Sequence, residues 1–134
     1  MTDIAGGMYP MAKVLWLSLA GACGTLSRYA LCELAGKLKG GPIPLGTFAV
    51  NIAGSFFFGL LYASAQSRLN LSHETRTILL VGFMGAFTTF STFAFDTAKL
   101  LHSQQWLHAL GNVAGQVLLG LVALIGGVLV GRAI

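Results

Sequence analysis

The spacing of the charged residues is the feature that most limits how this chain can fold. Only 9% of its 134 residues are charged, and they separate long, mainly apolar stretches. A helix needs roughly 20 mainly apolar residues to cross the hydrocarbon core of a bilayer. We therefore expect an all-α membrane protein that forms one domain over residues 13–132, with transmembrane segments at about 13–35, 45–66, 75–100 and 105–131.

The segments outside these spans are short. The connection Lys37–Pro44 is rich in Gly and Pro and predicts a turn, and the other two connections are polar. Met11 stands just before the first span. We expect residues 1–12 to be an N-terminal extension or the result of an alternative start.

The balance of positive charge predicts no preferred orientation in the membrane. Four spans would place Lys13, Arg68, Arg76 and Arg132 on one side and Arg28, Lys37, Lys39 and Lys99 on the other. Since the Lys/Arg bias largely sets topology, equal numbers favour insertion in both orientations. This would allow an antiparallel dual-topology homodimer with a two-fold axis in the membrane plane. Burial of Arg28 would remove it from the count and leave a single orientation open.

Two glycine pairs in the fourth span have the spacing that lets membrane helices approach closely. Gly111 and Gly115 form one pair, and Gly127 and Gly131 form the other. Small residues four apart allow close backbone contact between helices. The pairs predict close helix packing but do not indicate which helix is the partner.

A run rich in hydroxyl groups interrupts the third span. It reads Gly85-Ala86-Phe87-Thr88-Thr89-Phe90-Ser91-Thr92-Phe93, and its last seven positions hold four hydroxyls and three phenylalanines. Each hydroxyl needs a hydrogen-bond partner inside hydrocarbon, so the run suits the lining of a pathway better than a plain membrane anchor. Glycines and hydroxyls also weaken a helix, which predicts a break near Thr88. Carbonyl groups freed at a break are good ligands for a small cation.

Polar residues also recur in the second span. Thr47, Asn51 and Ser55 are four apart and share one face of a helix. Asn51 lies too deep to reach either membrane surface. The stripe could hold helices together or line a pathway, and the sequence leaves both open. The neighbouring Phe56, Phe57 and Phe58 point in three directions, so we expect them to pack in the ordinary way.

The sequence does not predict an enzyme. Its carboxylates are far from the centres of the spans and do not form a pair suited to acid–base chemistry. His102 and His108 flank the last turn, where we expect solvated side chains and not metal ligands. The net charge of +4 is scattered and predicts no nucleic-acid partner.

Three features together resemble the small bacterial fluoride-channel family, Fluc, also known as CrcB. They are the run from Gly85 to Phe93, Asn51 in the second span, and the pattern Gly21-x-x-Gly24-x-x-x-Arg28 in the first. The resemblance covers roughly residues 13–132, and the Thr-Thr-Phe-Ser-Thr-Phe core is its most specific part.

The resemblance implies a fluoride-selective channel in the bacterial inner membrane. An antiparallel homodimer would hold two pores through which fluoride leaves the cytoplasm passively. It also implies that the third helix breaks at the two-fold axis, where carbonyls of Gly85 and Thr88 from both subunits hold a structural sodium ion. The implied pore residues are Asn51, Phe90, Phe93, Thr47 and Ser91, with Arg28 towards a pore mouth.

The chain departs from the family pattern in several places. Ala86 replaces a usual glycine, and Asp96 stands where glutamate is usual. Asn112 and Gln116 occupy positions often held by tyrosine and a small hydroxyl residue. We expect these two amides to continue a polar track.

Two other functions remain open. A small multidrug-type proton-coupled antiporter is also a four-helix dual-topology dimer, but it needs a carboxylate deep in the first span. Here the first span offers only Glu33, near its end. In a non-transporting subunit of a larger membrane complex, the polar stripe would only hold helices together.

Overall fold

The computed structural model describes residues 9–38, 41–67 and 71–134, and every regular element within them is a helix. The elements are α1 (Pro10–Gly36), α2 (Leu45–Ser67), α3 (His73–Thr77), the π-helix η1 (Ile78–Met84), α4 (Gly85–Phe87), α5 (Phe90–His102) and α6 (Trp106–Ala133). Pro10 is favourable at the start of α1 because its missing N–H has no intrahelical acceptor there. Most of the predicted N-terminal extension lies outside the described residues.

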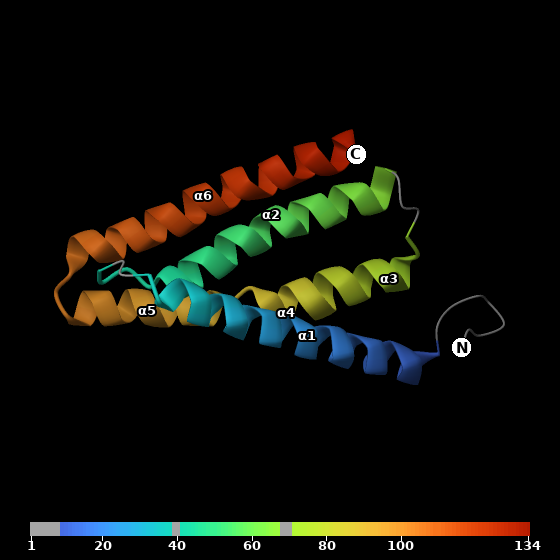
Figure 1. Ribbon diagram of the computed structural model, residues 1–134, viewed down its shortest axis with the longest axis horizontal. Helices are drawn as coiled ribbons and strands as arrows, with labels where there is room; N and C mark the ends of the chain where they lie inside the picture. The colour runs from blue at the N-terminus through green and yellow to red at the C-terminus, as the bar shows by residue number, and fades with distance from the viewer. Residues whose placement is uncertain (1–8, 39–40, 68–70) are drawn as a thin grey trace.

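The helices run up and down beside one another (Figure 1). The start of α1, the end of α2, the start of α3 and the end of α6 lie at one end of the molecule. The α5–α6 connection and the start of α2 lie at the opposite end. Helices α3, η1, α4 and α5 follow one another along a single line, so together they make one long segment.

Three helical segments in the described residues are long and apolar enough to cross a membrane. They are Leu45–Gln66, His73–His102 and Trp106–Ala133. The chain is therefore a multi-pass membrane protein. Helix α1 is not among the three; it carries Arg28 and Glu33 in its second half, and a fourth crossing remains a prediction.

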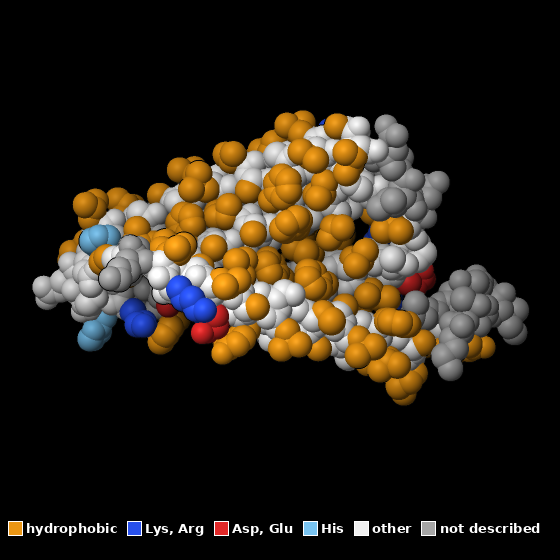
Figure 2. Space-filling model, in the orientation of Figure 1, with side chains coloured by type: hydrophobic (Ala, Val, Ile, Leu, Met, Phe, Trp, Pro, Cys, Tyr) orange, Lys and Arg blue, Asp and Glu red, His pale blue; other side chains and the backbone are white. Residues whose placement is uncertain are grey.

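The surface agrees with a lipid environment. Hydrophobic side chains cover much of the visible face (Figure 2). On α6, Leu107 is 80% exposed and Val122 is 66% exposed. Exposed apolar surface of this extent is unfavourable in water but faces lipid at no such cost.

Helices α2 and α6 meet along a glycine seam made of Gly59, Gly127 and Gly131. A Cβ atom on Gly127 would collide with the Phe56 carbonyl, and one on Gly59 would collide with the Leu124 carbonyl. The close packing predicted for Gly127 and Gly131 is therefore confirmed.

The other predicted glycine pair is different. Gly111 has no atom within 4 Å of the place where a Cβ would lie. A Cβ on Gly115 would come within 2.9 Å of the Phe48 ring. This pair therefore does not bring two backbones together, because its partner at Gly115 is an aromatic side chain.

The third segment is interrupted at Thr88 and Thr89, which we refer to as the break. Both residues are extended, with φ −85° and ψ 159° at Thr88 and φ −149° and ψ 111° at Thr89. The predicted interruption is thus present. Helix α5 restarts at once because the Thr89 hydroxyl accepts a hydrogen bond from the Thr92 N–H at 3.2 Å, an N-cap.

Candidate functional site

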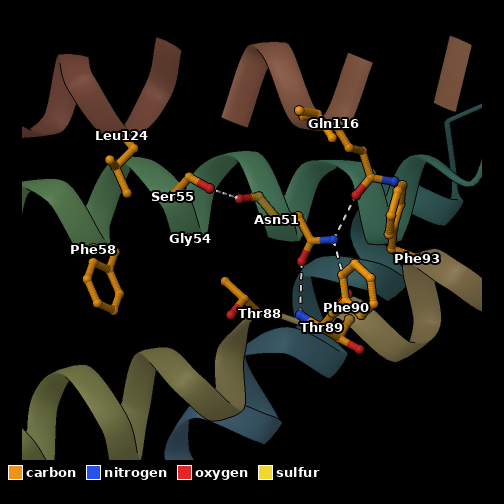
Figure 3. Close-up of a pocket in the computed structure, with 11 residues that line it drawn as sticks. Asn51, Gly54, Ser55, Phe58, Thr88, Thr89, Phe90, Phe93, Gln116 and Leu124 are labelled. Atoms are coloured by element: carbon orange, nitrogen blue, oxygen red, sulfur yellow. Dashed lines mark hydrogen bonds between the residues drawn. The ribbon is translucent and has the colours of Figure 1, made fainter. Parts of the chain in front are cut away.

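A cavity of about 410 Å³ lies beside the break, between α2, α5 and α6 (Figure 3). Phe90 on its wall is 78% exposed, so the cavity opens on the surface of the single chain. Its lining residues are Asn51, Gly54, Ser55, Phe58, Thr88, Thr89, Phe90, Phe93, Gln116, Val117 and Leu124. None of these side chains carries a charge.

Asn51 holds the backbone of the break. Its Oδ1 accepts a hydrogen bond from the Thr89 N–H at 2.9 Å, and its Nδ2 donates to the Thr89 carbonyl at 3.2 Å. The side-chain amide of Asn51 therefore supplies the acceptor that the Thr89 N–H would have had in a continuous helix, and it adds a donor to the Thr89 carbonyl.

A chain of amides continues from Asn51 into α6. Asn51 Nδ2 also donates to Gln116 Oε1 at 2.7 Å, and Gln116 Nε2 donates to Asn112 Oδ1 at 2.9 Å. Asn112 Nδ2 in turn donates to the Thr97 hydroxyl at 3.0 Å. Asn112 is fully buried and Gln116 is nearly so. The network links α2, α5 and α6 across the cavity wall.

The hydroxyls around the cavity already have acceptors. Ser55 donates to the Asn51 backbone carbonyl at 2.7 Å, and Thr88 donates to the Met84 carbonyl at 3.1 Å. The Thr89 hydroxyl donates to Thr92 Oγ1 at 2.9 Å. These bonds satisfy groups that would otherwise be costly to bury.

The break frees backbone groups on both sides. Because Thr89 N–H is bonded to Asn51, the Gly85 carbonyl lacks the donor that a continuous helix would supply. Within the described chain, the Gly85 and Thr88 carbonyls have no hydrogen-bond donor, and the N–H groups of Phe90 and Ser91 have no acceptor. The break thus offers free carbonyls on its α4 side and free N–H groups on its α5 side.

Aromatic rings form the apolar part of the wall. Phe90 and Phe93 are one helical turn apart on α5, with ring centroids 5.6 Å apart and planes tilted by 51°. An aromatic ring has a positive edge and a negative face, so its edge attracts an anion weakly. The cavity wall therefore combines aromatic rings with neutral amides.

Residues 15–128 match the family model described as CrcB-like protein, Camphor Resistance (CrcB). The chain belongs to the CrcB family. The fluoride-specific ion channel FluC of Nitrosococcus oceani is 53% identical over 110 residues, which cover 82% of this chain and 88% of that protein. The proteins of the same name from Maridesulfovibrio salexigens and Nitratidesulfovibrio vulgaris are 42% and 45% identical over 124 residues, 92% of this chain and 98% and 100% of theirs.

The structure of this CrcB-family chain brings some of the predicted site residues together. Asn51, Thr88, Phe90, Phe93 and Gln116 all line the cavity. Asn112 lies behind Gln116 and contacts the cavity only through the amide chain. Two members of the predicted polar stripe on α2, Asn51 and Ser55, line the cavity.

Other predicted residues lie outside the cavity. Thr47 is buried one turn from Asn51 and donates to Asp96 Oδ2 at 2.7 Å. Ser91 is exposed and contacts the Thr89 hydroxyl at 3.3 Å. Arg28 is half-buried on α1, and Gly85 is exposed on the α4 side of the break.

Sequence reasoning missed Phe58 and Gly54. We expected ordinary packing for Phe58, but its ring lines the cavity, while Phe56 and Phe57 contact each other edge to face at 5.5 Å. A Cβ on Gly54 would collide with the Thr88 side chain. The sequence signal for both is their spacing from Asn51, since residues three and seven positions further lie on nearly the same helix face.

Proposed function

We propose that this protein is a fluoride-selective channel of the bacterial inner membrane that lets fluoride leave the cytoplasm passively. The observation that carries the proposal is the uncharged cavity at the break, in a chain whose relatives are named as fluoride-specific ion channels. A proton-coupled antiporter has less support, because the described cavity wall contains no carboxylate.

The chemistry of the cavity suits a small, strongly hydrated anion. A pore must replace the water around fluoride with other donors, yet a fixed positive charge would hold the ion too tightly to release it. Amide N–H groups, backbone N–H groups and ring edges are neutral and meet both conditions. Along the path we place Asn51, Phe90, Phe93, Ser91 and Thr47, with Asn112 and Gln116 on the α6 side and Arg28 towards one mouth.

A second copy of the chain would complete the pathway. The residues that follow the break, Phe90, Ser91 and Thr92, are exposed although they lie at the centre of an apolar segment. Among the described residues, Lys13, Arg76 and Arg132 belong to the terminal parts of α1, α3 and α6 that lie at one end, while Lys37 and Lys99 follow or close the helices α1 and α5 that run to the other end, with Arg28 in the second half of α1. Both features support an antiparallel, dual-topology homodimer in which two breaks meet and the first helix also crosses the membrane.

A structural sodium ion fits the break. The Gly85 and Thr88 carbonyls lack hydrogen-bond donors in the described chain, and carbonyl oxygens are suitable ligands for a small hard cation. We propose that these two carbonyls from each subunit would hold sodium between the copies. A bound cation would supply positive charge that offsets part of the cost of bringing an anion into hydrocarbon.

An efflux measurement tests the function. Purified protein in liposomes loaded with fluoride should release it when valinomycin and potassium balance the charge, while liposomes loaded with chloride should release almost none. Equal rates for the two halides would contradict fluoride selectivity. Empty liposomes and liposomes containing an unrelated membrane protein provide the background.

Replacing an aromatic wall residue tests the pathway. Phe93→Ile should slow fluoride release by roughly tenfold, because it removes a ring edge at a cost on the order of 1 kcal/mol. Phe57→Ile is the matched control, since Phe57 lies on α2 outside the cavity lining. Dimer elution on a sizing column should be the same for both variants. Equal fluoride flux through the two variants would show that Phe93 is not part of the pathway.

A further inference from the structure

A second cavity, of about 230 Å³, lies where α2 and α6 end. Tyr62, Ala63 and Gln66 of α2 line it together with Val128 and Arg132 of α6. Both helices end on the same side of the molecule (Figure 1). One guanidinium, one amide and one phenol hydroxyl therefore share the same small space.

The three polar side chains of this cavity have donors to offer. Within residues 9–38, 41–67 and 71–134, the side chains of Tyr62, Gln66 and Arg132 form no hydrogen bond or ion pair. Tyr62 is 47% exposed, and Gln66 and Arg132 are exposed as well. A ligand could therefore bind all three without breaking a bond of the described chain.

The glycine seam fixes the positions from which these side chains project. A Cβ atom on Gly131, the neighbour of Arg132, would collide with the Leu60 carbonyl, so the two backbones touch beside the cavity. Ala63 is buried between the two helices. The cavity is thus formed by closely packed backbones and is present before any ligand binds.

The depth of the cavity in the bilayer follows from helix geometry. Thr88 is near the middle of the segment His73–His102, which places the break near the bilayer centre. From Asn51, which bonds to the break, α2 rises about 16 Å to Tyr62 and about 22 Å to Gln66. Hydrocarbon extends about 15 Å from the centre, and headgroups extend to about 20–22 Å. Tyr62 therefore lies at the hydrocarbon boundary and Gln66 lies among the headgroups.

Arg132 reaches the same level from the other helix. Gln116 bonds to Asn51 at the depth of the break, and α6 rises about 24 Å from Gln116 to Arg132. Lipid phosphate groups are found at this level. A guanidinium can bind two phosphate oxygens through parallel N–H donors, and an amide N–H or a phenol hydroxyl can bind a third oxygen.

We propose that this cavity binds the phosphate group of an anionic membrane lipid between the ends of α2 and α6. Arg132 holds the phosphate oxygens, while Gln66 and Tyr62 add neutral donors. Among the described lining residues Arg132 alone is charged, so a headgroup with a net negative charge fits better than a zwitterionic one. The site is separate from the cavity at the break, and the inference does not depend on fluoride transport.

Native mass spectrometry of the intact protein in detergent tests the site. The wild type should bind dioleoylphosphatidylglycerol more tightly than dioleoylphosphatidylcholine, which has the same acyl chains. Arg132→Gln should weaken phosphatidylglycerol binding about tenfold, because it removes charged hydrogen bonds to the phosphate. Lys13→Gln removes a positive charge at the same end of the molecule but outside the cavity, and it should bind this lipid like the wild type. Wild-type affinity in Arg132→Gln, or an equal loss in Lys13→Gln, would overturn the proposal.

A milder variant and a free anion complete the test. Tyr62→Phe keeps the ring and removes one neutral donor, so the affinity for phosphatidylglycerol should fall roughly threefold. Thermal unfolding without added lipid shows whether each variant is folded, and Tyr62→Phe decides the matter if Arg132→Gln is not. Inorganic phosphate should not displace the lipid, because it lacks the acyl chains that place a headgroup at this depth. Displacement by inorganic phosphate at the lipid's own concentration would show a site for free phosphate and overturn the assignment to a lipid.

Discussion

The two sides of α2 differ in how they meet the rest of the chain. On one side, the glycine seam brings the backbones of α2 and α6 into direct contact, with Gly127 against the Phe56 carbonyl and Gly59 against the Leu124 carbonyl. On the other side, α2 meets the break through the amide of Asn51 and through Gly54, which lies against the Thr88 side chain, and a cavity of about 410 Å³ remains open.

The two sides of α2 therefore have different roles: one packs closely against α6, and the other satisfies backbone groups at the break. Close backbone contact needs no side chains and leaves no room, so the seam can be rigid and apolar. The break exposes backbone groups that only polar side chains can satisfy, and satisfying them leaves space between the helices. The single chain therefore completes the seam by itself and leaves the break side open.

The largest effect is expected at the seam. Gly127→Val should prevent α6 from packing on α2, because the new Cβ would collide with a backbone carbonyl that cannot move aside. The loss should exceed the roughly 1–3 kcal/mol that extra methylenes cost in a packed core. Thermal unfolding in detergent, followed by tryptophan fluorescence, measures the effect.

The neighbouring glycine provides the control for this prediction. Gly126 has no atom within 4 Å of its missing Cβ, so Gly126→Val should unfold close to the wild-type temperature. If both variants are equally stable, the seam does not hold the two helices together. If both are equally unstable, valine itself and not the collision is responsible.

A smaller effect on stability, with a larger one on function, is expected at the break. Asn51→Ala leaves the Thr89 N–H and the side-chain oxygen Oε1 of Gln116 without these partners. The loss should lower the free energy of unfolding by about 2–4 kcal/mol. Fluoride release should be lost, because both the break and Gln116 lose their support. Efflux and thermal unfolding are measured on the same preparation.

Ser18→Ala serves as the comparison for Asn51→Ala. Ser18 is exposed on α1 and bonds only to the Val14 carbonyl of its own helix, at 2.9 Å. It should change neither efflux nor stability appreciably. A stable Asn51→Ala protein with full efflux would show that the break does not depend on the α2 amide.

The smallest effect is expected one turn away, where α2 meets α5 through a single hydrogen bond. Thr47→Val removes the 2.7 Å bond to Asp96 and should lower the free energy of unfolding by about 1 kcal/mol, since Asp96 is partly exposed and regains water. Thr25→Val, at an exposed position on α1, is the matched control. If Thr47→Val lowered the free energy of unfolding as much as Asn51→Ala does, the Thr47–Asp96 bond would contribute as much to stability as the bonds of Asn51 at the break.

Much of the fold follows from local sequence. Charge spacing predicted four helical segments whose limits lie within about three residues of the observed ones, because an apolar run of membrane length leaves a helix as the main way to satisfy its backbone. The break at Thr88 was predictable for a related reason, since hydroxyls and glycines compete with the helix locally. Asn51 stood out because an amide in an apolar helix needs a partner.

Other features could not be read from the chain. The pattern of glycines gave two equivalent pairs, and only the position of α2 decides that Gly127 and Gly131 meet a backbone while Gly111 meets nothing. Nothing in the sequence distinguishes Phe58 from Phe56 and Phe57, and only the fold shows that Phe58 lines the cavity beside the break.

By itself, the sequence determined that this protein is helical, apolar and interrupted in its third segment, because backbone groups in hydrocarbon must be satisfied within a few residues. Only the tertiary structure decided which polar groups form hydrogen bonds with one another and which have no partner in the described chain. That outcome depends on bonds between residues far apart in the chain, such as Asn51 and Gln116, which are 65 positions apart.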